Sequence, residues 1–368
     1  GMASRVGRVA GVTIGDVAAA ARVSRSTVSR AFTRPQLLSP ATVEQVLTTA
    51  ARLGYVGNQA ARALSTGRFG NIAVVVPDIA NPFFPPLVRS LQLAAETADL
   101  AVFLGDSDES SEREAKLIAR LAPQVEGFVL ASPRLSEQLI RELAATRPVV
   151  LVNRDLDGIA RVLIDSSGGM TEAVLLLKRL GHQRLAYLAG PRDSWSDGQR
   201  RTTLARVSEQ AGLTVEVIET GRPSYAAGRE SVSAIVRSGA TAAIAFDDVV
   251  SQGVLAGLEV RGISVPADFS LVGCDDTLAA LTTPALTTVS AGAASAGTAA
   301  AQLLITLLQS PDGRPADAAA GGEGAAAAGA SGAAGGRAGE GGGGGECVRI
   351  GTHLVVRGTT AVRGGMVA

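Results

Sequence analysis

The chain has the sequence TIGDVAAAARVSRSTVSR at residues 13–30, and this stretch predicts two short helices joined by a tight turn. Thr13, with Asp16 three residues later, matches a capping box that opens the first helix. Ser24 is suited to cap the second helix, which carries arginine and hydroxyl side chains near its start. Such a pair is typical of a helix-turn-helix, whose second helix enters the major groove of DNA. A small helical bundle with a solvated basic face is the alternative interpretation.

The residues around this pair support contact with nucleic acid. Ser39-Pro40 gives an N-cap followed by proline at the first helical position, so a third helix is expected, and Gly54 is placed to end it. The 368-residue chain has no net charge, but residues 1–70 hold nine arginines and only two acids, a net charge of +7. Residues 71–368 therefore carry a net charge of −7. A basic head on an acidic body is expected of a protein whose N-terminal part meets nucleic acid.

From Ile72 onward, short apolar runs alternate with amphipathic segments of helical length. The runs expected to be strands are 72–76, 101–104, 127–130, 149–152, 162–164, 185–188, 215–218, 242–246, 271–273 and 354–356. The helices expected between and after them lie near 86–98, 110–121, 135–145, 168–180, 199–211, 225–238, 248–260 and 294–308. This alternation predicts the α/β class, with parallel sheets covered on both faces. The number of units favours two lobes.

Residues 316–346 differ in kind, because 25 of these 31 residues are Ala or Gly. A segment without large apolar side chains cannot offset its ordering entropy, so a disordered loop is expected. An Ala-rich helix in its first half is the alternative, which the interspersed glycines disfavour.

Composition excludes several classes of protein. No run approaches the ~18 apolar residues of a transmembrane helix, and the N-terminal residues have no apolar region typical of a secretory signal. Cys274 and Cys347 lie far apart without metal-ligand spacing, so neither a disulfide framework nor a bound metal is expected. No cofactor is expected, and the cytoplasm, in association with the nucleoid, is the expected location.

A ligand site can be placed from the strand pattern, because open parallel sheets bind ligands beyond the carboxyl ends of their strands. The segments that follow the apolar runs are 78–84, 106–107, 132, 153–154, 195–200, 247–248 and 274–276. They are rich in carboxylates, which accept hydrogen bonds from sugar hydroxyls, and they include arginine and aromatic side chains. The alternative for any single one of these residues is that it is an ordinary surface residue without a ligand contact. The run after Val76 is not a Gly-rich phosphate turn, and neither histidine has a nucleophile and an acid at a recognisable spacing, so an enzyme is not expected.

The chain resembles the lactose/galactose-repressor family. The motifs that carry the resemblance are 13–18 (TIGDVA), 23–30 (VSRSTVSR), 39–40 (SP), 53–55 (LGY), 58–64 (NQAARAL), 81–84 (NPFF), 180–182 (LGH), 272–276 (VGCDD) and 355–359 (VVRGT). They extend over the chain except for residues 1–11 and the Ala/Gly insert.

The resemblance implies a three-helix DNA-binding headpiece at 12–57, a hinge helix or linker at 58–69, and a two-lobed, periplasmic-binding-protein-like body at 70–368. The lobes would comprise 70–165 with 291–312, and 167–290 with 347–368. The chain would cross between them near 165–167, 290–292 and 311–315.

The resemblance also implies the contacts of the headpiece. Arg25 and Ser26 would read operator bases, while Leu64 would wedge into the minor groove from a hinge helix at 58–66. The full set of implied DNA contacts is Thr13, Arg25, Ser26, Thr27, Ser29, Arg30, Asn58, Ala61 and Leu64. Two residues depart from the family pattern: Gly57 stands where proline is frequent, and Arg22 occupies a turn position where glycine is common.

In the body, the implied effector contacts are Asp78, Phe83, Phe84, Asp165, Trp195, Arg200, Asp247 and Asp275. Asp247 replaces the usual Asn or Ser, and an added carboxylate favours polyols or cationic groups and disfavours anionic ligands. The implied protein is a repressor that binds an inverted-repeat operator as a homodimer or tetramer, without a membrane partner, and responds to a small molecule. A sugar is the first expectation for the effector and a nucleoside or purine the second. The rival class is a transporter's solute-binding protein, which shares the two-lobed body.

Overall fold

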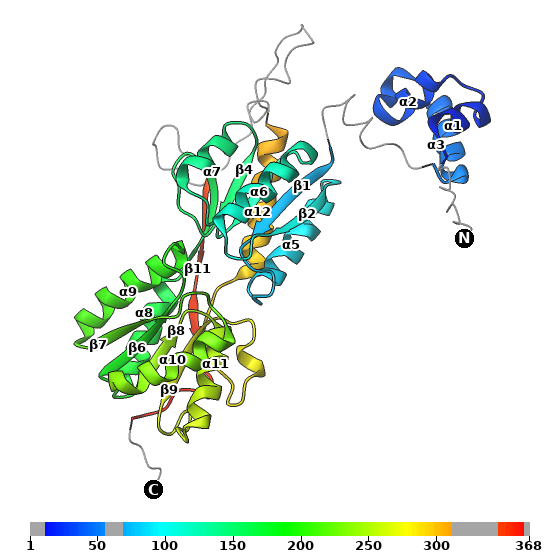
Figure 1. Ribbon diagram of the computed structural model, residues 1–368. Coiled ribbons are helices and arrows are strands. Elements are labelled where there is room, and N and C mark those ends of the chain that lie inside the picture. The colour runs from blue at the N-terminus through cyan, green and yellow to red at the C-terminus, as the bar shows by residue number, and fades with distance from the viewer. Residues whose placement is uncertain (1–11, 56–68, 311–344, 364–368) are drawn as a thin grey trace, which may run out of the picture. The chain divides into compact units, whose positions relative to one another are not determined.

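The computed structural model describes residues 12–55, 69–310 and 345–363, and its contacts divide the chain into two compact units, 1–70 and 71–368. The first unit contains α1 (Ile14–Ala20), α2 (Arg25–Thr33) and α3 (Pro40–Leu53) (Figure 1). The three helices share a small core that includes the fully buried Val17, Val28 and Val46. A 3-10 turn, Pro35–Leu37, precedes α3.

The predicted caps of these helices are confirmed. Thr13 and Asp16 form the reciprocal capping box of α1. Ser24 and Ser39 accept the backbone N–H groups that begin α2 and α3, and Gly54 ends α3 in the left-handed conformation.

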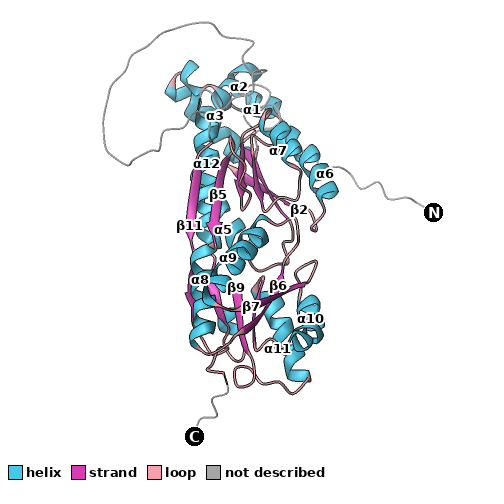
Figure 2. Ribbon diagram, turned by 90° about the vertical axis from the view of Figure 1, so that its left-hand side faces the viewer, coloured by secondary structure: helices cyan, strands magenta, loops and turns pink. Residues whose placement is uncertain are grey.

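The second unit contains two lobes, each a sheet with helices on both faces (Figure 2). In the first lobe the strand order is β11-β5-β4-β3-β1-β2, and every pair is parallel. The strands are β1 (Asn71–Val76), β2 (Ala101–Asp106), β3 (Phe128–Ala131), β4 (Val149–Val152), β5 (Ala160–Asp165) and β11 (Cys347–Gly351). Helices α5 (Phe84–Glu96) and α12 (Ala293–Gln309) pack on one face, and α6 (Ser111–Leu121) and α7 (Glu137–Ala144) pack on the other.

The second lobe has the order β12-β10-β9-β8-β6-β7, in which only the β12–β10 pair of the described strands is antiparallel. The strands are β6 (Arg184–Ala189), β7 (Thr214–Glu219), β8 (Ala242–Ala245), β9 (Ser270–Asp275), β10 (Thr287–Ser290) and β12 (His353–Val355). Helices α8 (Ser167–Arg179) and α9 (Trp195–Ala211) cover one face, and α10 (Tyr225–Ser238) and α11 (Asp248–Val260) cover the other. No described helix has the length and apolar character needed to cross a membrane.

One predicted lobe boundary is wrong. Residues 347–351 form β11, which pairs with β5 in the first lobe instead of belonging to the second. The backbone N–H of Arg161 donates to the Glu346 carbonyl at 2.8 Å, which joins the returning chain to β5. The third crossing therefore lies at Thr352, between β11 and β12, and not at 311–315. The crossings near 165–167 and 290–292 are where the sequence predicted them.

The Ala/Gly insert falls almost entirely outside the described residues, so its predicted disorder stays a prediction. Its last two residues, Gly345 and Glu346, are described. Both carbonyls accept hydrogen bonds from Arg161, one from its guanidinium and one from its backbone N–H.

Glycine permits the close packing of α10 against α11. A Cβ atom at Gly253 would lie 2.0 Å from the Tyr225 carbonyl oxygen, and one at Gly228 would lie 2.1 Å from the Val250 carbonyl oxygen. Both obstacles are backbone atoms, so any side chain forces the helices apart.

We therefore expect Gly253→Ala to destabilise the chain by about 1–3 kcal/mol or more, as overpacking does. Gly198→Ala is the matched control, because Gly198 is an exposed helical glycine whose added Cβ would meet nothing within 4 Å. It is expected to stabilise α9 by about 0.5–1 kcal/mol. Thermal unfolding should show a lower melting temperature for Gly253→Ala and a higher one for Gly198→Ala than for the wild type. Equal melting temperatures would contradict the packing argument.

Candidate DNA interface and effector site

The start of α2 presents polar and basic side chains to solvent. Arg25, Ser26 and Arg30 are exposed, while Thr27 and Ser29 are half-buried. The Ser24 hydroxyl lies 2.7 Å from that of Ser26 and 2.8 Å from that of Thr27, and it also accepts the Thr27 N–H. These contacts fix the first turn of α2 without using either arginine side chain, and the Arg25 guanidinium lies beside Gly15 of α1.

The headpiece carries an excess of positive charge. Residues 12–55 contain five arginines and two acids, and none of these arginines forms an ion pair within that range. Asp16 is engaged with Thr13, whose hydrogen bonds lower the pKa of the Asp16 carboxyl. The surface is therefore suited to a polyanion, whose phosphates attract unpaired arginines.

Arg22 occupies the turn between α1 and α2 with φ of 52°, in the left-handed region that disfavours a residue with a side chain. The side chain is exposed. Strain retained at a surface turn suggests a functional reason for the arginine, and its place before α2 suits a backbone phosphate.

Arg22→Gly is expected to relieve the strain and to stabilise the headpiece by about 1 kcal/mol. The same change should weaken DNA binding for all sequences alike and reduce the salt slope by about 1, as loss of one phosphate contact does. Hydrogen exchange of the headpiece amides and binding titrations at several salt concentrations measure the two effects. Higher protection with unchanged affinity would show that Arg22 has no part in DNA binding.

The hinge contacts implied by the resemblance cannot be located. Asn58, Ala61 and Leu64, together with Gly57, lie outside the described residues.

Arg200 is the centre of the site in the body. It lies on α9 and is 6% exposed. Its Nη2 is 3.3 Å from Asp275 Oδ1, its Nη1 donates to the Phe246 carbonyl, and its Cζ lies 4.8 Å from the centroid of the Phe246 ring. The Nε atom is buried and has no partner among the described residues. Because a buried N–H without an acceptor is costly, this atom points to a ligand oxygen.

Two carboxylates, Asp275 and Asp247, lie close to this guanidinium, and a third, Asp248, lies next to them. Asp275 is the last residue of β9, with φ of 102°, and Asp247 and Asp248 stand at the start of α11, where Asp247 is the N-cap. Burial raises the pKa of Asp275 to about 7 and that of Asp248 to about 6, and nearby Arg200 opposes the shift at Asp275. Burial also raises the pKa of Asp247. The group is held together by the convergence of β8 and β9, which are neighbours in the sheet.

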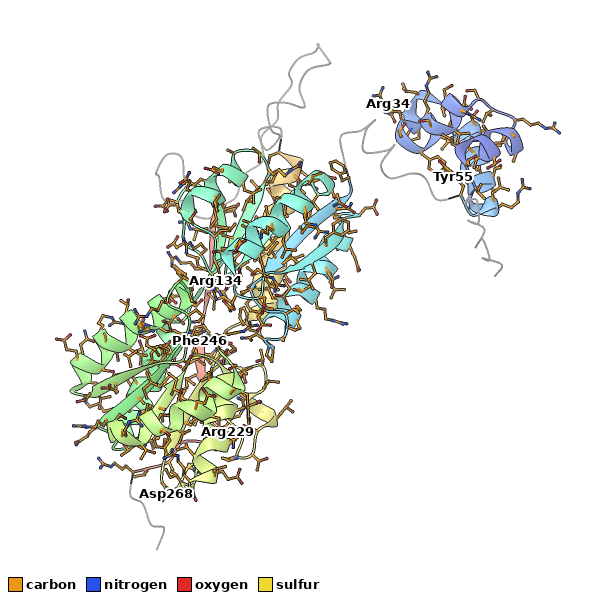
Figure 3. The ribbon with its side chains drawn as sticks, viewed as in Figure 1. Arg34, Tyr55, Arg134, Arg229, Phe246 and Asp268 are labelled. Carbon is orange, nitrogen blue, oxygen red and sulfur yellow. The ribbon has the colours of Figure 1, made fainter. Side chains whose placement is uncertain are left out.

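Polar contacts join the two lobes near this cluster. Figure 3 labels Arg134 of the first lobe and Phe246 of the second in this region. Asn81 Nδ2 donates to Asp247 Oδ2 at 3.0 Å, and Arg222 bridges Asp78, at 2.9 Å, and Asp108. Arg134 lies 3.7 Å from Asp193. These contacts place the ends of the first lobe's strands against those of the second.

Sequence analysis missed Arg222 and Arg134, and it treated Asn81 only as part of a motif. Arg222 follows the carboxyl end of β7 by three residues, so the strand-end rule could have found it. The acids that it joins come from the other lobe, and no local pattern shows that approach.

The structure brings Arg200, Asp247 and Asp275 together, and it places Asp78 at the contact between the lobes, where it pairs with Arg222. Phe83 and Phe84 are 7% and 6% exposed, form an edge-to-face pair and belong to the first lobe's core. The Asp165 carboxylate accepts the Ser167 N–H at the first crossing, and half-buried Trp195 begins α9. The aromatic face beside Arg200 is that of Phe246, which was not predicted.

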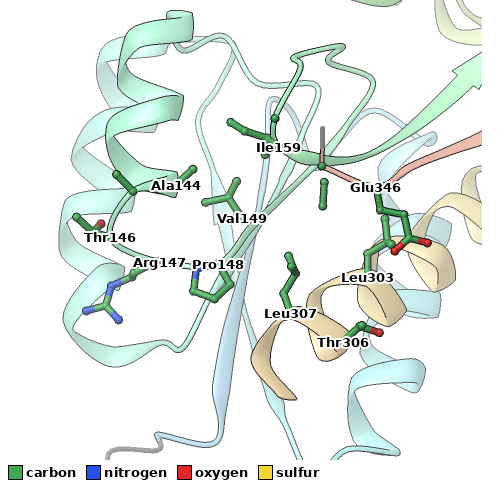
Figure 4. A pocket seen from close by; sticks show the side chains of 14 residues that line it. Ala144, Thr146, Arg147, Pro148, Val149, Ile159, Leu303, Thr306, Leu307 and Glu346 are labelled. Carbon is green, nitrogen blue, oxygen red and sulfur yellow. The ribbon is translucent and has the colours of Figure 1, made fainter. Parts of the chain in front are cut away.

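A cavity of about 280 Å³ lies elsewhere, among α7, the starts of β4 and β5, α12 and Gly345–Glu346 (Figure 4). This is the amino end of the first lobe's sheet. Arg147 borders it, but its guanidinium donates to the Val125 carbonyl. The cavity is therefore separate from the cluster around Arg200.

Comparison with known proteins supports both the DNA-binding headpiece and the two-lobed body. Residues 13–58 match the family described as bacterial regulatory proteins, lacI family, and residues 174–320 match a periplasmic binding protein-like domain. Similar curated proteins include the HTH-type transcriptional regulator GalS of Salmonella typhimurium, 33% identical over 74% of this chain and 83% of its own, and catabolite control protein A of Priestia megaterium, 32% identical over 74% and 85%.

Solved structures extend the similarity to the whole fold. The Lac repressor bound to ONPG in its repressed state has a TM-score of 0.76 at 25% identity, and the transcriptional regulator CelR–cellobiose complex has 0.65 at 26%. Both alignments cover 95% of this chain and 99% of the other. The chain is thus a DNA-binding transcriptional regulator controlled by an effector, and not an enzyme. It belongs to the lacI family of bacterial regulatory proteins.

Proposed function

We propose that this chain is a cytoplasmic repressor that binds an inverted-repeat operator as a homodimer and is controlled by a sugar bound between its lobes. The observation that carries the operator-binding half is the start of α2, where exposed Arg25, Ser26 and Arg30 stand on a capped helix and neither arginine forms an ion pair with a described residue. Arginine is suited to bidentate contact with guanine, and hydroxyls are suited to phosphates or bases. A twofold dimer would match an inverted repeat.

The effector half rests on Arg200 and the carboxylates beside it. An unpartnered Nε, two flanking aspartates and the Phe246 ring offer a sugar both donors and acceptors. The CelR complex with cellobiose supports a carbohydrate over a nucleoside. No cofactor is part of the proposal. The hinge residues Asn58, Ala61 and Leu64 are proposed to contact DNA at the centre of the operator.

Control requires that the effector bind the two lobe arrangements with different affinity, typically by about 1–3 kcal/mol. The contacts of Asn81 and Arg222 across the lobes are the interactions that such a rearrangement would change.

The test is selection of the full chain on a randomised DNA library, followed by anisotropy titration of the selected site with and without a carbohydrate panel. Enrichment of an inverted repeat, with affinity changed by a sugar, is the expected result. Failure to enrich any DNA, together with sugar binding, would instead favour the solute-binding protein that shares this two-lobed body.

A further inference from the structure

The cluster around Arg200 has an excess of negative charge. Asp247 and Asp275 are close to the Arg200 guanidinium, which lies 3.3 Å from Asp275, and a third carboxylate, Asp248, is close to both acids. Asp248 is satisfied within the lobe, because its carboxylate accepts from Thr288 Oγ1 at 2.8 Å and from the Thr277 N–H at 2.9 Å. Asp247 therefore has no ion-pair partner among the described residues, although the charge of nearby Arg200 lowers its pKa.

Both carboxylate oxygens of Asp247 accept hydrogen bonds, and these bonds oppose the burial that raises its pKa. Its Oδ1 accepts the Val250 N–H at 2.7 Å, which caps α11, and its Oδ2 accepts from Asn81 Nδ2 at 3.0 Å. The Asn81 amide has only one orientation available, since its Oδ1 accepts the Phe83 N–H at 3.0 Å. Both oxygens of Asp247 thus face donors, and the N-terminus of α11 further favours a negative charge there.

Arg200 marks the place where a ligand would sit. The residue is more than nine-tenths buried, and its Nε has no acceptor among the described residues. A ligand oxygen can take that N–H. A negatively charged ligand group is disfavoured at this place. The Arg200 charge is already neutralised by Asp275, and the Asp247 carboxylate would repel a second anion.

We propose that the effector is a neutral or amino-substituted sugar and that Asp247 excludes sugar acids and sugar phosphates from the site. This inference rests on the proposed control by a sugar and narrows its class. A hydroxyl can donate to a carboxylate and accept from Arg200 Nε at once, and an ammonium group can replace the hydroxyl at the carboxylate. A ligand carboxylate or phosphate has only acceptor oxygens, so it cannot donate a hydrogen bond to the Asp247 carboxylate and is repelled by it.

The test is calorimetric titration of the full chain with matched sugars at pH 8, where Asp275 is largely ionised. Each neutral sugar that binds is compared with its amino sugar, its uronic acid and its phosphate. We expect the anionic forms to bind about 100-fold more weakly than the neutral form, and Asp247→Asn to reduce that ratio by about tenfold or more, because one like charge is removed. The asparagine can still accept the Val250 N–H, so the cap of α11 is retained.

Two controls separate charge from other effects. Asn81→Ala removes the contact between the lobes without changing charge, so it should shift affinity for neutral and anionic sugars alike. Glu216→Gln removes a negative charge from an exposed position of β7 in the same lobe and should leave the ratio unchanged. Thermal unfolding confirms that each variant is folded.

The outcomes distinguish this inference from the proposed function. If neutral and anionic sugars bind equally, or if Asp247→Asn leaves their ratio unchanged, the assignment to Asp247 is wrong while sugar control stands. If no sugar of any charge binds although the selected DNA is bound, the proposed effector class fails and this inference fails with it.

Discussion

Arg200→Met is expected to abolish the effector response while operator binding persists. Arg200 is the guanidinium at which the ligand acceptor is expected, and its loss removes a charge-assisted donor from a buried site. The headpiece does not contain this residue, so its contacts with DNA are unchanged. Anisotropy titrations of operator against effector measure both properties in one experiment.

The substitution also leaves Asp275 without its cation. Removing one member of a buried pair costs about 3–5 kcal/mol, so the stability of the variant has to be measured beside its response. Arg200→Lys is the second variant. It retains the charge but cannot contact Asp275 and the Phe246 carbonyl with the same planar fork. We expect it to fold better than Arg200→Met and to respond only at much higher effector concentration.

Arg206→Met is the matched control, because Arg206 is exposed on the same helix. It should respond to effector like the wild type. A wild-type release curve for folded Arg200→Met would remove Arg200 from the effector site.

The elements that sequence analysis located best are those whose signal is local. Thr13, Ser24 and Ser39 each mark a helix start through their own side chains, and all three act as predicted. The strands buried on both faces appear as continuous apolar runs, as in β4, where all four residues are buried. Neither signal needs information about the rest of the chain.

The elements that were missed lack such a signal. β10 has the sequence TTVS, whose buried threonines bond to Thr359, Thr360 and Asp248 instead of forming an apolar run. β11 lies at a sheet edge and alternates between exposed and half-buried residues. The third crossing was misplaced because β11 was not recognised as a strand of the first lobe.

Part of the site depends on the packing of one lobe against the other. Arg200, Asp247 and Asp275 could be selected from strand ends and resemblance, since each follows or faces a strand of one sheet. The pairing of Asn81 with Asp247 joins residues 166 positions apart, and Arg222 meets Asp78 across 144 positions. Such contacts follow from how the lobes meet, which no local periodicity encodes.

Arg25→Ala is expected to remove discrimination at one base position of each half-site, at a cost of about 1–3 kcal/mol there. Arg25 is the first residue of α2 and is exposed, with its guanidinium close to Gly15 of α1, where a Cβ would lie 3.0 Å from Nη2. From this position at the start of a recognition helix, a planar fork can contact O6 and N7 of one guanine.

The variant isolates that contact from folding. Alanine is a favourable helix residue, and the Ser24 cap of α2 does not involve the Arg25 side chain. Arg52→Ala is the matched control, since Arg52 is an exposed arginine in the last turn of α3, away from the start of α2. It removes the same charge and should leave the selected sequence unchanged. Selection on a randomised library compares the two motifs directly: one degenerate position per half-site should appear for Arg25→Ala alone, and an intact motif would place base recognition elsewhere on the headpiece.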